Sequence, residues 1–279
     1  MLLALLFVLL FGLVAMGAPV AVALTLSSLV YILAEGRVPD IVVMHRMING
    51  VDSFPLLAVP FFILAGNLMN TAGITNRIYD FAKALVGWLR GGLGHVNIGG
   101  SVIFAGMSGT AVADAGGLGT IEIKAMKDHG YDLDFAVGVT AASSTIGPII
   151  PPSLPMVIYG VMANASIGQL FAAGFVPGLL MAAALMVMVA WYARVRNYPR
   201  DASFSWRVLW FAFWRALPAL FTPAIIIGGM TFGLFTPTEA AIAACVWALL
   251  LGLFYRTLDL RRLIRVSFDT IETTAVVLL

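Results

Sequence analysis

The sequence has one cysteine, three histidines and few charged residues. Cys245 has no second cysteine to pair with, so an intrachain disulfide is excluded, and a cysteine-based metal cluster is not expected. Charged residues make up 11% of the chain, against about 25% in an ordinary soluble domain. The formal net charge is only +2, which gives no electrostatic support for binding nucleic acid.

Apolar residues are abundant instead. They form 61% of the 279 residues, and the mean hydropathy is +0.99. A water-soluble globule could not cover such a chain with polar surface, whereas a lipid bilayer suits it as a solvent. We therefore predict an all-α polytopic membrane protein, since helices satisfy their own backbone in lipid.

The first 90 residues contain two long apolar stretches. Residues 3–34 predict a first membrane helix with a kink at Gly17-Ala18-Pro19. Their first few residues resemble a signal peptide, but a basic N-terminal region is lacking and the apolar stretch is longer than that of a signal peptide. Residues 35–52 are polar with an apolar stripe, which predicts a short interfacial helix. Residues 53–72 form the second apolar stretch.

Residues 74–90 are amphipathic. One face carries Ile74, Ile78, Phe81, Leu85 and Trp88. This spacing predicts a helix lying along the membrane interface. A helix packed on the protein outside the membrane fits the same pattern.

Residues 91–121 are apolar but rich in glycine, and they are interrupted by Ser108, Thr110 and Asp114. This pattern predicts a re-entrant hairpin that turns at membrane depth. Gly99 and Gly100 are better explained by close helix packing. Asp114 is a functional candidate as an ionisable residue in an apolar stretch, or else the N-cap of the returning half-helix. Residues 122–134 are polar again.

Residues 135–162 are apolar but broken in the middle. Pro148, Pro151 and Pro152 fall within five residues, which a continuous helix does not tolerate. The segment 143–153 therefore predicts a half-helix, an extended link and a second half-helix. Residues 165–193 predict an uninterrupted spanning helix.

Arginines cluster in two places beside apolar spans. The first group lies between Arg194 and Arg215 and the second between Arg256 and Arg265. The positive-inside rule places both segments in the cytoplasm. Residues 217–254 between them repeat the hairpin pattern around Thr231–Glu239. Glu239 is a functional candidate, or else a carboxylate that suits a helical first turn. Residues 257–270 are amphipathic and basic, and residues 271–279 predict the start of a further helix.

The broken segments carry the chemistry. Carbonyl groups freed in lipid must be buried in protein or line a cavity, where they can coordinate Na⁺. Ser108, Gly109, Thr110 and the 143–153 link supply hydroxyl and carbonyl oxygens, which suit an alkali cation.

An enzyme is a weaker interpretation. Gly106-Met107-Ser108-Gly109 matches the GxSG string of rhomboid-type intramembrane serine proteases, whose serine needs a histidine base on a later membrane helix. Only His129 lies downstream, and its surroundings are polar. An aspartyl protease needs two apposed aspartates, and Asp114 has no evident partner. We therefore expect no enzyme activity.

The sequence resembles the large membrane subunit (DctM-like) of tripartite ATP-independent periplasmic (TRAP) transporters. The resemblance runs through the whole chain in order, and its combination of motifs is specific. The matching segments are Gly17–Ala21, Phe61–Gly66, Ala105–Asp114, Ser143–Ser153 and Gly233–Ala241.

The resemblance implies a Na⁺-coupled elevator in the bacterial cell inner membrane that imports an organic acid, such as a C4-dicarboxylate or a sialic acid. The implied partners are a small membrane subunit, which widens the scaffold, and a periplasmic substrate-binding protein. A scaffold subunit that does not transport is the alternative, although it would need neither hairpins nor a broken helix.

The resemblance also implies site residues. A first Na⁺ site would use Ser108, Gly147, Ile150 and Pro152, largely through main-chain oxygens, and a second would lie near Gly233 and Thr236. The implied substrate-binding residues are Ser108, Gly109, Thr110, Asp114, Ser144, Pro151, Ser153 and Thr236.

The implied fold is an inverted-repeat ion transporter whose second repeat is incomplete here, because no second broken helix follows. We divide the chain into scaffold and interfacial helices (1–90), a first transport half (91–162), a spanning helix with a basic connector (163–216), a second hairpin (217–256) and a terminal connector (257–279).

Overall fold

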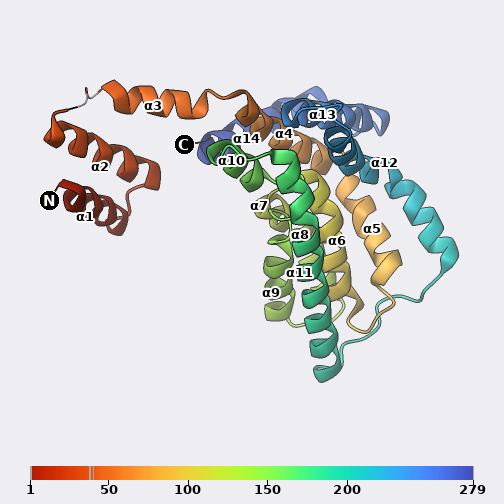
Figure 1. The fold of residues 1–279 in the computed structure, drawn as a ribbon. Helices are drawn as coiled ribbons and strands as arrows, with labels where there is room; N and C mark the ends of the chain where they lie inside the picture. The colour runs from red at the N-terminus through yellow and green to blue at the C-terminus, as the bar shows by residue number, and fades with distance from the viewer. Residues whose placement is uncertain (1, 38, 40, 279) are drawn as a thin grey trace. The chain divides into compact units, whose positions relative to one another are not determined.

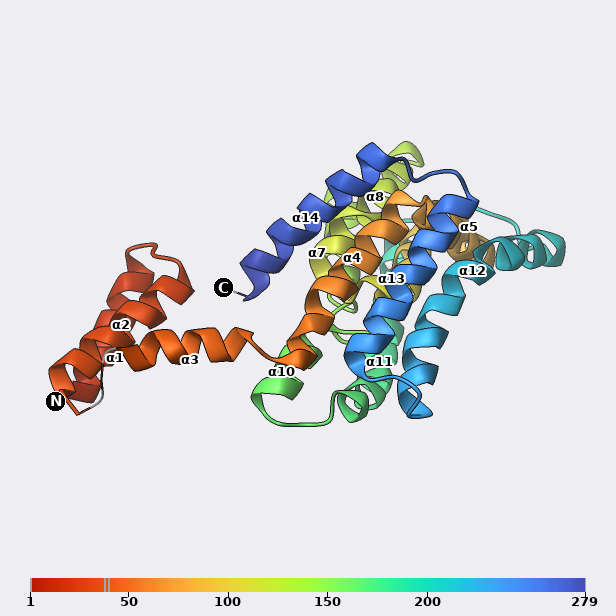
Figure 2. The same ribbon diagram turned by 90° about the horizontal axis from the view of Figure 1, so that it is seen from above.

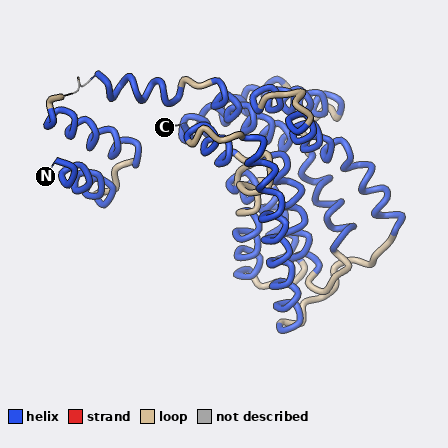
Figure 3. Tube along the Cα trace, in the orientation of Figure 1, coloured by secondary structure: helices blue, strands red, loops and turns tan. Residues whose placement is uncertain are grey.

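The computed structural model describes residues 2–37, 39 and 41–278, and throughout these ranges the regular elements are helices (Figure 3). The chain forms two compact units: residues 1–54 with 275–279, and residues 55–274 (Figures 1 and 2). The boundary lies at the start of the second apolar stretch, inside the predicted segment 1–90.

The first unit begins with two helices, α1 (Leu2–Ala15) and α2 (Val20–Glu35), which pack against each other. The prediction of one kinked helix is therefore wrong. Gly17 has a φ of +84°, and the Gly17 and Ala18 N–H groups donate to the carbonyls of Val14 and Leu13, both at 3.0 Å. This is the pattern of a glycine-terminated helix end. Pro19 then precedes α2.

The polar segment that follows contains the predicted short amphipathic helix. It is α3 (Ile41–Val51). Its lipid-interface placement stays a prediction.

Among the described residues, four helical segments are long and apolar enough to cross a membrane. They are Phe54–Thr71, which comprises the 3₁₀ turn Phe54–Leu57 and α4 (Ala58–Thr71), α11 (Ile167–Val195), α12 (Trp206–Thr231) and α13 (Pro237–Phe254). This agrees with a polytopic membrane protein. α4 packs along α13 and against α6 (Gly92–Ser108), and it buries Phe62, Leu68 and Met69.

α5 (Ile74–Val86) is the predicted amphipathic helix, and one side of it packs on the protein, while its placement relative to the membrane stays a prediction. Ile74, Ile78 and Ala82 are buried, and the helix packs against α6 and α12. Leu85 and Trp88, predicted on the same apolar face, are exposed. The helix is thus packed on the protein by its N-terminal two-thirds.

α6 and the two helices after it form a hairpin. The chain reverses at Gly109 and Thr110, continues through α7 (Ala111–Gly116) and returns as α8 (Leu118–Asp128). A Cβ atom placed on Gly100 of α6 would lie 2.8 Å from Glu122 Oε1 and 2.9 Å from Leu118 Cδ2. α8 therefore doubles back against α6, and Gly100 serves close packing.

α9 (Leu133–Ser144) runs beside α6 in the same direction. Asn97 Nδ2 donates to Thr140 Oγ1 at 2.7 Å, and Ser101 Oγ donates to Ser143 Oγ at 3.1 Å. Ser143 Oγ donates in turn to Asn97 Oδ1 at 2.6 Å. This buried network fixes the register of α9 against α6.

The segment 217–254 is also a hairpin, but it differs from the predicted re-entrant one. Its arms, α12 and α13, have 26 and 18 residues, and each is long and apolar enough to cross a membrane. Trp247 Nε1 donates to the Pro218 carbonyl at 2.9 Å, so the arms are antiparallel. α12 begins at Trp206, which places Arg207 and Arg215 in the helix rather than in the connector.

α14 (Leu260–Leu278) is one helix. The prediction that a basic amphipathic segment ends near residue 270 and a new helix starts at 271 is wrong. Neither glycine nor proline occurs between residues 257 and 279, so nothing local interrupts the helix.

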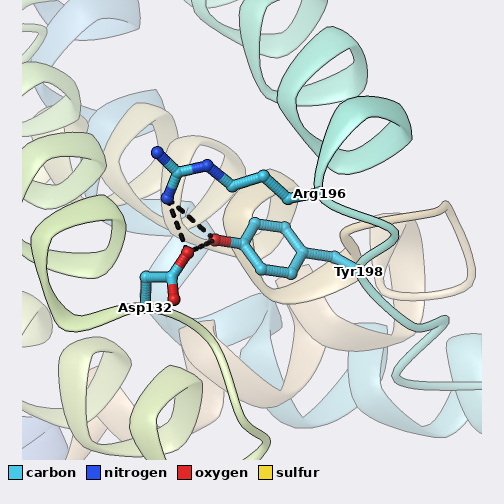
Figure 4. A network of polar contacts seen from close by, with 3 residues as sticks. All are labelled: Asp132, Arg196 and Tyr198. Carbon is cyan, nitrogen blue, oxygen red and sulfur yellow. Dashed lines mark hydrogen bonds and ion pairs between the residues drawn. The ribbon is translucent and has the colours of Figure 1, made fainter.

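A polar network joins the start of α9 to the end of α11 (Figure 4). Asp132 Oδ2 accepts hydrogen bonds from Tyr198 Oη at 2.8 Å and from Arg196 Nη1 at 2.6 Å. These bonds, from Tyr198 first and Arg196 second, lower the pKa of the Asp132 carboxyl. The Tyr198 ring packs 4.4 Å from that of Tyr131.

We expect this network to make stability depend on acid pH. Because the folded pKa of Asp132 is lowered, its contribution is present above the unfolded value of about 4 and is lost as the pH falls through the folded value. Tyr198→Phe removes the hydroxyl and keeps the ring, so it should lower the melting temperature at pH 7 by a few degrees at most. The difference from wild type should shrink as the pH falls below the unfolded value and through the lowered folded value. Tyr159→Phe, at an exposed ring, is the control; a pH-independent difference would contradict the assignment.

Candidate functional site

The hairpin tip is built from Ser108, Gly109 and Thr110. α6 ends at Ser108, and Gly109 follows with a φ of +62°, a conformation that favours glycine. Thr110 is the N-cap of α7, and its Oγ1 accepts from the Ala113 N–H at 3.1 Å. The Ser108 hydroxyl is buried and makes no hydrogen bond within the described residues. The tip thus presents a free hydroxyl in the protein interior.

The broken helix is confirmed, with one correction. α9 ends at Ser144, and α10 (Leu154–Met162) begins after Ser153. Residues 145–149 are turns rather than an extended link, because the Ile146 and Gly147 N–H groups donate to the Ser143 and Ser144 carbonyls at 2.9 and 3.1 Å.

The rest of the link leaves backbone oxygens free. The Pro151–Pro152 peptide bond is cis. Within the described part of the chain, no turn, loop or cap hydrogen bond ends on the carbonyl oxygens of Gly147, Ile150 or Pro152. These are the three link residues that the resemblance to TRAP transporters implies as ligands of the first cation site.

The structure brings the tip and the link together. The Leu154 N–H donates to the Gly109 carbonyl at 3.3 Å. A Cβ atom placed on Gly147 would lie 3.1 Å from the Thr110 carbonyl oxygen, and one on Gly109 would collide with the Pro152 carbonyl. The two segments therefore meet backbone to backbone, and a side chain would collide with a carbonyl at Gly109 and would crowd one at Gly147.

Neighbouring helices hold this junction in place through further close approaches. A Cβ atom on Gly106 of α6 would lie 2.9 Å from Pro223 Cγ of α12. One on Gly66 of α4 would lie 3.2 Å from Ser108 Cα. On α11, Gly174 and Gly178 face Ile149 and Ile150 of the link. Packing from three helices thus fixes the position of tip and link.

Two serines assigned to substrate binding have local roles. Ser144 Oγ donates to the Thr140 and Ala141 carbonyls at 2.8 and 3.1 Å. Ser153 is the N-cap of α10, where its hydroxyl accepts from the Met156 N–H at 3.3 Å and donates to the Pro148 carbonyl. Both hydroxyls stabilise the ends of the broken helix.

Asp114 is not a helix cap. Thr110 holds that position, and Asp114 lies buried in the first turn of α7. Neither carboxylate oxygen accepts a well-formed hydrogen bond within the described residues, although the Ser101 hydroxyl on α6 interacts with the group. A buried, poorly compensated carboxylate in a membrane protein is a functional candidate.

Sequence reasoning missed Glu122, which it placed in the polar segment 122–134. Glu122 is buried in α8 against α6, close enough to Asp114 for their charges to interact, and neither of its oxygens accepts a hydrogen bond from a described residue. The available signal was the i, i+4 stripe of Leu118, Glu122 and Met126, all of which are buried.

The second predicted ion site lies elsewhere, at the turn between α12 and α13. Gly233 has a φ of +71° and is open to its surroundings. Thr236 is the N-cap of α13 and forms a reciprocal capping pair with Glu239, as the first-turn placement of Glu239 predicts. A turn and a cap explain both residues without an ion.

The histidine required by the protease alternative lies away from Ser108. His129 caps the C-terminal end of α8, which is the end of the hairpin opposite the tip. Its Nδ1 is hydrogen-bonded to the Ala125 carbonyl at 2.8 Å. This arrangement does not pair a serine with a base.

Sequence comparison with known proteins identifies relatives of this chain. Residues 7–279 match the family model described as "Tripartite ATP-independent periplasmic transporter, DctM component". The sialic acid TRAP transporter large permease protein SiaM of Vibrio cholerae is 51% identical over 96% of this chain and 63% of its own length. The 2,3-diketo-L-gulonate TRAP transporter large permease protein YiaN of Escherichia coli is 40% identical over 96% of this chain and 64% of its own length.

A third relative is named for a different class of acid. The C4-dicarboxylate TRAP transporter large permease protein DctM of Vibrio cholerae is 40% identical over 90% of this chain and 56% of its own length. The chain thus spans less than two-thirds of the length of these relatives. On the strength of the matching family model and these identities, the chain belongs to the DctM component family of the tripartite ATP-independent periplasmic transporters.

Proposed function

We propose that this chain forms the ion-binding half of a TRAP transporter large permease, which imports an organic acid across the bacterial inner membrane. The observation that carries the proposal is the junction of tip and link, where Leu154 bonds to Gly109 and Gly147 meets Thr110. A scaffold that does not transport has no need for a helix broken next to a reversing tip.

A Na⁺ ion at this junction would be held by oxygen atoms. The Gly147, Ile150 and Pro152 carbonyls and the Ser108 residue supply such ligands, and the Ser108 hydroxyl has no other partner in the described structure. In lipid, freed carbonyls are tolerated where they line a cavity or bind an ion. The ion would join the α6–α8 hairpin to the broken helix and would order both segments.

The substrate would bind next to the ion. Three relatives are named for sialic acid, 2,3-diketo-L-gulonate and C4-dicarboxylates, which are all organic acids. We propose a carboxylate substrate at the tip and link, with contacts to Ser108, Gly109, Thr110 and Pro151. Asp114 would act on the cation side of the site, because a carboxylate repels an anionic substrate.

We further propose a re-entrant α6–α8 hairpin, movement of the hairpin and broken helix as an elevator, and cooperation with a small membrane subunit and a periplasmic binding protein. The name "TRAP transporter" of the relatives supports these partners. The arginine-rich segment Arg194–Arg215 would lie in the cytoplasm.

The test is uptake by the complete transporter, reconstituted in vesicles with its small subunit and binding protein. We expect an inward Na⁺ gradient to drive accumulation of a radiolabelled organic acid, and equal Na⁺ on both sides to abolish accumulation above equilibrium. Candidate acids are sialic acid, succinate and 2,3-diketo-L-gulonate. Accumulation driven by a proton gradient without Na⁺ would overturn the ion assignment, and no uptake of any organic acid would overturn the substrate class.

A further inference from the structure

A basic cavity lies away from the tip and the link. It has a volume of about 720 Å³ and is lined by α5, the connector before α12 and the first turns of α12. Arg77 and Lys83 of α5 and Arg207 and Arg215 of α12 contribute positive charge, and Asp80 is the one acidic residue in the lining. The cavity thus carries a local charge of +3 from these five side chains.

No ion pair among the described residues neutralises this charge. The ion pairs among the described residues join Arg37 to Glu35 and Arg196 to Asp132, so none of them involves a basic residue of the cavity. Arg77 instead stacks on the Tyr255 ring, 3.4 Å from its centroid. Arg215 lies 5.7 Å from the centroid of the Phe211 ring. These contacts orient both guanidinium groups and leave their charge available.

Exposed aromatic side chains line the cavity and occur at neighbouring positions of the same helix. Trp210 and Phe211 belong to its lining and are 64% and 65% exposed. Trp206 and Trp214 on the same helix are 75% and 53% exposed. Exposed tryptophans at one end of an apolar helix are typical of the headgroup level of a membrane. This composition is the one expected of a cavity at the level where charged headgroups and acyl chains meet.

The start of α12 adds hydrogen-bond donors. Ser205 is the N-cap residue, but its side chain does not cap the helix, so the N–H groups of the first turn have no side-chain acceptor there. Ser203 and Ser205 also line the cavity. Arginine side chains and helix N-termini are both suited to phosphate oxygens.

We propose that this cavity binds the headgroup phosphate of an anionic phospholipid, such as phosphatidylglycerol or cardiolipin. The four basic residues bind the phosphate diester, and Trp210 and Phe211 pack against the upper acyl chains. Basic pockets between membrane helices are suited to such headgroups. A bound lipid would bridge α5, which packs on the ion-binding hairpin, and α12. The proposal is independent of the transported ion and substrate.

The experiment uses the complete transporter, purified in detergent and stripped of lipid. Bound phosphatidylglycerol is counted by native mass spectrometry, and the melting temperature is measured as the lipid is titrated. We expect one tightly bound anionic lipid and a melting temperature that rises with its concentration. Arg207→Gln/Arg215→Gln should weaken this binding about tenfold or more. Arg261→Gln/Arg265→Gln on α14 removes the same charge from exposed positions outside the cavity and should leave it unchanged.

Several outcomes would overturn the proposal. If both double variants lost lipid binding equally, net charge alone would explain the binding. An equal rise of the melting temperature with phosphatidylcholine would mean that the lipid covers apolar surface and that its charge is not recognised. An equal rise of the melting temperature with inorganic phosphate would mean that the cavity binds a soluble anion. Lipid binding only after removal of the small membrane subunit would show that a protein covers the cavity. If the glutamine pair fails to fold, Arg207→Lys/Arg215→Lys keeps the charge and should retain the binding.

Discussion

Gly147→Leu is expected to remove most Na⁺-dependent uptake by the complete transporter. A Cβ atom at this position already lies 3.1 Å from the Thr110 carbonyl and 3.2 Å from the Ser144 carbonyl, so a leucine would push the link away from the hairpin tip. The carbonyl oxygens proposed as ligands would then separate from Ser108. We expect the Na⁺ concentration for half-maximal uptake to rise about tenfold or more, equivalent to about 1.4 kcal/mol of lost binding free energy.

The matched control is Gly138→Leu. Gly138 lies in α9, the helix that leads into the link, and a Cβ atom there would meet nothing within 4 Å. This variant should express and transport as the wild type does. Ser108→Ala should have a smaller effect than Gly147→Leu if the main-chain oxygen is the ligand. An unchanged Na⁺ dependence in Gly147→Leu, with normal expression, would exclude the junction from ion binding.

Gly109→Ala is expected to be the most destabilising single-methyl substitution at the tip. Two effects add up, because Gly109 has a φ of +62° and a Cβ atom there would collide with the Pro152 carbonyl. The left-handed conformation costs about 1–2 kcal/mol in alanine, and overpacking adds about 1–3 kcal/mol. The melting temperature in detergent should fall by about 5 °C or more.

A second glycine separates the two effects. Gly130 has a φ of +80° but open space around it, so Gly130→Ala should show only the conformational cost. Gly116→Ala, in a helix with open space and no positive φ, should show neither. An equal fall in melting temperature for Gly109→Ala and Gly130→Ala would mean that the tip does not contact the link as the structure describes.

Features with a local cause could be predicted from the sequence. Pro148, Pro151 and Pro152 break a helix wherever they occur, so the two halves α9 and α10 were predictable. The reversal at Gly109 and the capping role of Glu239 also depend on nearby residues. Gly17 had a local signal too, but two helices of 14 and 16 residues with one short turn between them look like a single long span in hydropathy.

Features set by distant contacts could not be predicted. Glu122 is buried because Gly100, on another helix, leaves room for its carboxylate. The network of Asn97, Ser101 and Ser143 depends on the register of α9 against α6, which no single segment encodes. The ion site near Thr236 stays a prediction, and a threonine before a proline serves equally well as a helix cap, which is the role that Thr236 has in α13.

The junction between the hairpin tip at Gly109 and the link at Gly147 and Pro152 is made by main-chain atoms. This determines which mutational surveys can detect it. Substitutions that delete side chains would remove almost nothing from a contact made by a carbonyl, an N–H group and the absence of a Cβ atom, so an alanine scan would register it only where a glycine is itself replaced, as in Gly109→Ala. A survey that adds volume at each glycine would instead reveal the junction as a row of intolerant positions. Searches for shared charged or polar residues among relatives would likewise miss it, since the feature that forms the junction is the absence of a side chain.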